Sequence, residues 1–361
     1  MTIVIAIFVF GLLIFIHELG HYVAARIFHV RVFEFAIGMG PKLIWFESKK
    51  TGIVYALRMI PFGGFVSMEG ELAEDANAAE ALRDMPEPLR DPRLGALATK
   101  PAWQRLIVHA AGALQNLLFG FLICIILTCT MTAGGTQIGE FRPVEGETRT
   151  SEEQGLMVGD EVIKVGKRHV YIAEQLYYEI VHQGGTDEAL TLTVRRDGEI
   201  RTFDITFPTQ EENGETFGVI DFVPYAVRKD FGTVVSQSFH RAGYLVRMVW
   251  DSIIDLVTGR YSFRAVSGPI GTAGVISNAA KSGFNTLLLL TALISVNLGI
   301  FNLLPLPALD GGHIFYTLIE LITRRRLPAK VVGIIDAVGM FLLFGLMIVV
   351  TVKDIITLVF K

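Results

Sequence analysis

Four stretches of the chain are long and apolar enough to cross a membrane as helices. About 20 apolar residues span the ~30 Å of hydrocarbon in a bilayer, and each stretch meets that length. The predicted transmembrane helices cover residues 1–30, 106–134, 283–313 and 330–358. The third is broken near its end by Pro305 and Pro307, because proline cannot continue a helix. This pattern predicts a polytopic α-helical membrane protein with four transmembrane helices.

Between the predicted spans the periodicity changes. Residues 31–70 contain two β-rich runs around the turn sequence SKKTG, which predicts a membrane-associated β-hairpin. Residues 71–105 form a polar cytoplasmic linker rich in Ala, Glu, Asp, Arg and Pro. Residues 135–225 alternate short strands with turns around one helical stretch at 173–181. We therefore expect a small α/β domain inserted between two spans.

Residues 226–282 are predicted to form an amphipathic surface helix and a loop. The segment 239–257 is nearly long enough to cross, but Arg247, Asp251 and Asp255 recur every four residues. That spacing gives the helix one polar face, as in helices that lie on a surface. A crossing here would place everything after it on the opposite side of the membrane.

Composition and charge agree with a membrane protein and set its orientation. The chain is 51% hydrophobic and 19% charged, with a mean hydropathy of +0.48. Its net charge of −4 without a basic face argues against nucleic acid as a partner. No basic residue precedes the first apolar run, so we interpret it as a retained span and not a secretory signal. Basic residues cluster after the first span and between the last two, so the positive-inside rule predicts extracytoplasmic N- and C-termini.

Two histidines and a glutamate interrupt the first apolar run, in the sequence FIHELGHYVAAR. In a helix His17 and His21 lie on one face, four residues apart, with Glu18 beside them. This is the arrangement of a zinc protease, in which the histidines hold the metal and the glutamate is the general base for water. Ionisable groups inside a span are costly and usually functional. The alternative is an interhelical hydrogen-bond network.

Such a site needs a third ligand, which we predict to be Asp310 in NLGIFNLLPLPALDGGH. Irregular backbone at membrane depth is tolerated only where it is buried in protein or lines a wet cavity. The alternating topology places Asp310 at the cytoplasmic end of the third span, at the depth of the two histidines. His313 is the alternative third ligand. A further alternative is that Asp310 is an aspartate at the membrane interface that binds no metal.

Substrate contacts are expected from Asn302 and Pro305. A transmembrane substrate arrives as a helix with its amides bonded internally, so it must be unwound before hydrolysis. The amide of Asn302 can hold the freed backbone, while Pro305 keeps the local chain open. The alternative for Asn302 is a polar contact between helices. The hairpin near residues 42–59 offers a strand edge with which an extended substrate can pair.

HELGH in the first span, one PDZ-like insert and NLLPLPALDGG in the third span resemble the site-2 protease family of intramembrane zinc metalloproteases, especially the bacterial regulator of sigma E protease group. The likeness to PDZ domains rests on EEQGLMVGDEVIKVGKRHV. The resemblance implies that His17, His21 and Asp310 bind Zn²⁺ and that Glu18 activates water. It also implies a multi-pass protein of the bacterial inner membrane. Its substrates would be single-span membrane proteins, such as anti-sigma factors or signal-peptide remnants.

One motif departs from that family. The family usually has Gly-Pro-x-x-Asn in the second span, whereas GALQN here has Ala113 in the position of the proline, so the role of Asn116 stays open.

The predicted function is a zinc-dependent endopeptidase that cleaves single-span proteins within the bilayer, near the cytoplasmic leaflet. By resemblance, its PDZ-like domain contacts extracytoplasmic tails of substrates already trimmed by another protease. One alternative is a catalytically silent PDZ membrane scaffold, against which the intact set of four site residues argues. A metal transporter would need polar residues along a path through the spans, and the second span offers only His109, Gln115 and Asn116.

Overall fold

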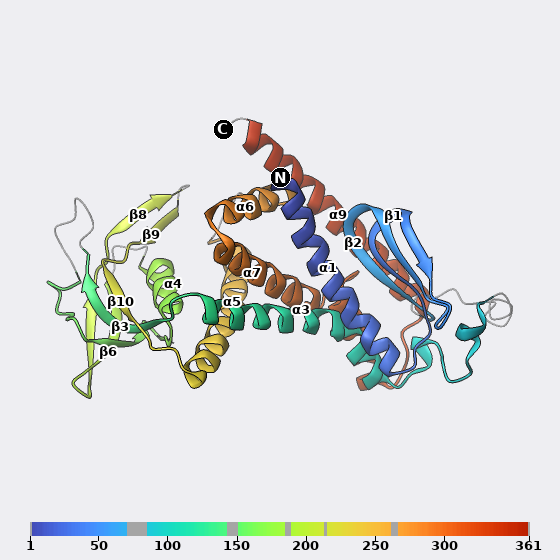
Figure 1. The fold of residues 1–361 in the computed structure, drawn as a ribbon, viewed down its shortest axis with the longest axis horizontal. Helices are drawn as coiled ribbons and strands as arrows, with labels where there is room; N and C mark the ends of the chain where they lie inside the picture. Colours follow the sequence, from blue (N-terminus) through green and yellow to red (C-terminus); the bar gives the residue numbers. More distant parts are fainter. Residues whose placement is uncertain are drawn as a thin grey trace. The chain divides into compact units, whose positions relative to one another are not determined.

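The chain folds into two compact units in a computed structural model (Figure 1). The structure describes residues 2–70, 85–142, 151–184, 189–212, 215–260 and 266–359. One unit combines residues 1–120 with 249–361, and the other consists of residues 121–248. The chain thus leaves the first unit once and returns to it, as an inserted domain does.

Four helices in the described part of the chain are long and apolar enough to cross a membrane. They are α1 (Thr2–Ile27), α3 (Ala102–Thr130), α7 (Phe284–Leu303) and α9 (Ala329–Val359). Only 6% of the most apolar window of α9 is buried within the protein. So much exposed apolar surface is favourable in lipid and unfavourable in water. The protein is therefore a multi-pass membrane protein.

The third predicted span is divided into two helices. Helix α7 ends at Leu303, because Pro305 and Pro307 cannot donate the backbone hydrogen bonds of a continued helix. Helix α8 (Asp310–Thr323) then begins at the predicted metal ligand. A single span over residues 283–313 is thus replaced by a helix, a turn and a second helix.

The region between the inserted domain and α7 also contains two helices. Helix α5 (Phe231–Thr258) is the predicted amphipathic helix. The following stretch, predicted as a loop, instead contains α6 (Pro269–Ser282). Its proline lies in the first turn, where a missing N–H costs nothing, and the apolar side chains of Ile276 and Ala279 are buried.

Strands β1 (Val32–Glu47) and β2 (Val54–Met68) form an antiparallel hairpin that packs beside α1 (Figure 1). Residues 54–57 pair on one side with residues 44–47 and on the other with 34–37, and residues 34–37 pair on their second side with 64–67. Phe35, Val66 and Met68 belong to a buried cluster with residues of α1. The part of the hairpin that contains Phe35, Val66 and Met68 is therefore fixed to the helix that carries HELGH.

Part of the predicted polar linker is packed against this hairpin. Residues 71–84 lie outside the described residues, but η1 (Glu87–Arg90) and η2 (Leu97–Thr99) bury Leu89 and Leu97. The buried guanidinium of Arg31 pairs with Glu69 and donates to the carbonyl oxygen of Leu89. The second half of the linker thus braces the base of the hairpin.

The second unit contains a mixed α/β domain. Its main sheet has the strand order β10-β3-β4-β6-β7, with β5 paired to β4. The strands are β3 (Gly134–Phe141), β4 (Glu161–Val165), β5 (Arg168–His169), β6 (Leu190–Arg196), β7 (Glu199–Ile205) and β10 (Phe222–Ala226), with a separate hairpin of β8 (Thr209–Glu212) and β9 (Glu215–Gly218). Helix α4 (Ala173–Gln183) places Leu176 and Ile180 in the core with strand residues.

Candidate metal centre

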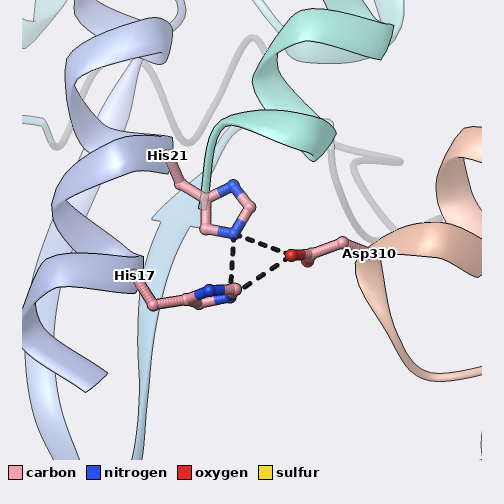
Figure 2. Close-up of side chains that lie close together, drawn as sticks. All are labelled: His17, His21 and Asp310. Carbon is pink, nitrogen blue, oxygen red and sulfur yellow. Dashed lines mark hydrogen bonds and ion pairs between the residues drawn. The ribbon is translucent and has the colours of Figure 1, made fainter. Parts of the chain in front are cut away.

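Three side chains converge where the start of α8 meets α1 (Figure 2). His17 and His21 project from adjacent turns of α1, and Asp310 is the first residue of α8. The two Nε2 atoms lie 3.3 Å apart, and Oδ2 of Asp310 lies 3.2 Å from Nε2 of His17 and 3.3 Å from that of His21. Zinc bonds of about 2.0–2.1 Å at tetrahedral angles separate ligand atoms by about 3.3–3.4 Å. The triangle therefore matches one face of a zinc tetrahedron.

The chemistry of these atoms also fits a cation. Oδ2 of Asp310 is buried and accepts no hydrogen bond of ordinary geometry from the described residues. Two imidazoles and a carboxylate are typical zinc ligands, and a catalytic site keeps its fourth position open. Among the residues that the structure describes, this is the one group of three potential ligands within 4.8 Å of one another.

The Glu18 side chain is buried between the metal ligands and the hairpin. It is 8% exposed and lies close enough to both histidines and Asp310 to interact with their charges. A Cβ added to Gly64 of β2 would lie 2.9 Å from Cγ of Glu18. The side chain of Glu18 is therefore close to both the metal ligands and β2.

Helix α3 orients the histidines from the opposite side. Nδ1 of His21 lies 2.8 Å from the carbonyl oxygen of Val108, so an Nδ1–H donates there and leaves the Nε2 lone pair for a metal. A Cβ at Gly112 would lie 2.2 Å from Nε2 of His21 and 2.8 Å from Cε1 of His17. The missing side chain of Gly112 therefore makes room for both histidine rings.

A turn with strained backbone fixes the start of α8. Ala308 has φ = +66°, in the left-handed region that alanine rarely adopts. Its N–H donates to Oδ1 of Asp336 over 3.2 Å, and the Tyr316 hydroxyl donates to the same oxygen over 3.0 Å. Asp336 therefore holds the turn that presents Asp310.

Sequence reasoning missed Val108 and Asp336 for different reasons. A backbone carbonyl such as that of Val108 has no signature in the residue type. Asp336, however, is an acid within the fourth predicted span, and such residues are usually functional. That signal was present in the sequence and was not used.

The remaining predicted site residues lie around this centre. The ring of His313 stacks on His109, with centroids 5.0 Å apart, and its Nε2 lies 3.9 Å from Asp336. Asp310, and not His313, therefore faces the two ligand histidines. Asn302 donates its amide to the Leu298 carbonyl of its own helix over 3.0 Å, and Pro305 is exposed in the turn between α7 and α8. Neither of these two side chains is brought into the ligand triangle.

Comparisons with known proteins indicate a zinc enzyme. The model of peptidase family M50 matches residues 5–346. A protein of Clostridium acetobutylicum is 35% identical over 362 residues, covering 98% of this chain and 97% of the relative. One from Clostridium perfringens is 33% identical, over 99% of this chain and 99% of its own length. The names of these two Clostridium proteins describe each as a proposed zinc metalloprotease. Zinc metalloprotease RasP of Geobacillus kaustophilus is 30% identical, over 98% of this chain and 97% of its own length.

Proposed function

We propose that this protein cleaves single-span membrane proteins within the bilayer near the cytoplasmic leaflet. The chain belongs to peptidase family M50 and is a zinc metalloendopeptidase. The observation that carries this proposal is the ligand triangle of His17, His21 and Asp310, whose two histidines lie on the apolar helix α1. His21 lies six residues before the end of α1, which corresponds to about 9 Å along the helix. The site would thus be embedded in the bilayer yet near one surface.

The proposed chemistry assigns one role to each side chain. His17, His21 and Asp310 would hold Zn²⁺, which would serve as a Lewis acid for the attacking water and the scissile carbonyl. The carboxylate of Glu18 accepts a proton from the attacking water and delivers it to the leaving amide nitrogen. Burial of Glu18 excludes bulk water that would compete for this proton.

A helical substrate must be unwound before this reaction, and the hairpin offers a way to hold it. Residues 64–67 pair on one side with 34–37, and Gly64 lies against Glu18 and Ile14 of α1. We place the substrate-pairing edge here, and not at residues 42–59, because Gly64 adjoins the proposed base. An extended substrate added to a strand edge would present its carbonyls in register.

Asn302 and Pro305 remain proposed substrate contacts. The Asn302 amide would exchange its bond to Leu298 for one to substrate backbone, at little net cost because one hydrogen bond replaces another. Pro305 interrupts the helix without an N–H of its own, so nearby carbonyls remain available to an unwound chain.

The proposed arrangement around the membrane follows the sequence. The protein would lie in the inner membrane of a bacterium. Both of its termini and its PDZ-like domain would be on the extracytoplasmic side. Strand β10 lies at one edge of the main sheet, and such an edge can accept the extended tail of a substrate by strand addition. A catalytically silent scaffold would use the same domain without the metal centre.

Reconstitution tests the proposed function. The protein is placed in liposomes with a panel of single-span model proteins whose spans contain helix-weakening Gly and Pro residues, and products are mapped by mass spectrometry. We expect cuts inside the apolar span towards its cytoplasmic end, abolished by a zinc chelator and restored by zinc. Cuts confined to soluble tails, or cleavage unaffected by chelation, would contradict the proposal.

A further inference from the structure

We propose that Asn116 is a positioning residue for the metal centre, because its amide oxygen accepts the Nδ1–H of His17 and so fixes the ring with Nε2 towards zinc. The inference rests on the ligand set of the proposed function. It gives a role to the one residue of the GALQN motif whose role the sequence left open.

The geometry places Asn116 beside the ligand on a face of α3 that already serves the site. Val108, Gly112 and Asn116 follow one another at four-residue intervals, so they share one face of α3. Asn116 is completely buried. Its Nδ2 lies 3.4 Å from Nδ1 of His17, and its Oδ1 has no hydrogen-bond partner among the described residues.

The required tautomer of His17 decides which amide atom faces the ring. A neutral imidazole carries one proton, so a ring that offers the Nε2 lone pair to a metal is protonated at Nδ1. An Nδ1–H needs an acceptor, and an amide N–H in the same place would oppose it. Rotating the amide by 180° exchanges oxygen and nitrogen without changing its shape, and it brings the unpartnered Oδ1 to the ring proton.

With this assignment, the Nδ1–H of each of the two histidines has a hydrogen-bond acceptor on α3. His21 already donates from Nδ1 to the Val108 carbonyl on the same face of α3. With Asn116 accepting from His17, each histidine has an acceptor behind it, as metal-binding histidines almost always do. One face of α3 would thereby set the direction of both rings.

Helix α7 contacts Asn116 through its backbone and not through its amide. The Ser295 hydroxyl donates to the backbone oxygen of Asn116 over 2.7 Å, and Ser295 is completely buried. This bond involves the backbone and not the amide. Ser295→Ala is therefore a matched control that alters packing around Asn116 but leaves the proposed acceptor in place.

The test compares zinc affinities, measured by chelator competition on the purified full-length protein. We expect Asn116→Leu, which has a similar volume and no acceptor, to bind zinc 10- to 100-fold more weakly. Asn116→Asp, which has only acceptor oxygens, should stay within a few-fold of wild type or bind more tightly, and Ser295→Ala should stay close to wild type. Asn116→Asp as weak as Asn116→Leu would show that a donor is needed, and wild-type affinity in Asn116→Leu would remove the role; either result overturns the inference.

A spectroscopic measurement on the wild type keeps the test independent of variant folding. In protein labelled with ¹⁵N-histidine and loaded with ¹¹³Cd, we expect metal coupling through Nε2 of His17 and a proton on its Nδ1. Coupling through Nδ1 would overturn the inference while leaving the ligand set intact. A wild type that binds no metal would overturn the proposed ligand set and this inference together.

Discussion

The carboxylate of Asp160 in the inserted domain is held by three hydrogen bonds. Arg196 donates to both of its oxygens over 2.6 and 2.7 Å, and the Met157 N–H donates to Oδ2 over 2.9 Å. Burial alone would raise the pKa of Asp160, but the hydrogen bonds and charge of Arg196 outweigh it and lower that pKa. The ionised carboxylate of Asp160 therefore stabilises the folded domain.

The lowered pKa fixes the sign of a pH dependence. The stabilisation is fully present above the pKa of a free aspartate, about 4, and is lost as the pH falls towards the lower folded pKa. We expect Asp160→Asn to cost about 2–3 kcal/mol at pH 7 and much less well below pH 4. Hydrogen exchange of β4 and β6 amides in the full-length protein measures both values, and a cost independent of pH would contradict this account.

The residues of the metal centre were predictable to different degrees for physical reasons. His17, Glu18 and His21 lie in one helix, whose fixed period turns spacing into geometry. The prediction of Asp310 required the topology of the whole chain, because this residue lies almost three hundred residues after the two histidines. The residues that orient them act through backbone carbonyls, amide orientation and a strained turn, and residue type alone does not reveal those contacts.

At the scale of elements, the close approach of α3 to α1 determines the shape of the site. An alanine at position 112 would place its methyl 2.2 Å from Nε2 of His21, so the ring would have to move away from the metal position. Overpacking of this kind costs about 1–3 kcal/mol. We expect Gly112→Ala to weaken zinc binding about tenfold or more, as measured by chelator competition.

Gly120→Ala is the matched control on the same helix. A Cβ there would lie 2.8 Å from Val296 of α7, away from the ligands. We expect it to lower the melting temperature while the folded protein keeps its zinc affinity. Equal effects of both substitutions on zinc binding would show that helix packing in general, and not contact with His21, controls the site.

Element boundaries were less predictable than element types. The apolar run that became α7 was evident, yet its end and the new start at Asp310 depend on contacts far away in sequence. Gly311 allows α8 to begin against α7, since a Cβ there would lie 2.0 Å from the carbonyl oxygen of Leu304. Helix α6 was missed because its Gly- and Ala-rich sequence has little periodic signal of its own.

At the scale of the whole molecule, the location of the site depends on how often the chain crosses the membrane. The four apolar helices were predictable because span length is a local property of the sequence. The side of each loop follows only if α5 does not cross. A crossing by α5 would place Asp310 on the side opposite His17 and His21.

Cysteine labelling tests this topology. In a background with Cys124→Ala and Cys129→Ala, single cysteines replace the exposed Lys50, Glu199 or Arg325. We expect an impermeant maleimide to label only Glu199→Cys in intact spheroplasts, with the other two labelled after permeabilisation. Labelling of Arg325→Cys in intact spheroplasts would mean that α5 crosses.

The substitution Glu18→Gln gives the most direct test of the catalytic centre. It asks whether Glu18 works with a zinc ion held by His17, His21 and Asp310 to hydrolyse a peptide bond. The variant keeps the size of the side chain and leaves all three ligands untouched, but an amide cannot act as a base at neutral pH. Purified wild type and variant are compared for zinc content and for cleavage of the same single-span proteins. We predict one zinc per protein in both and a loss of cleavage of at least about 100-fold in the variant; equal cleavage by the two proteins, or a wild type without stoichiometric zinc, would contradict the account.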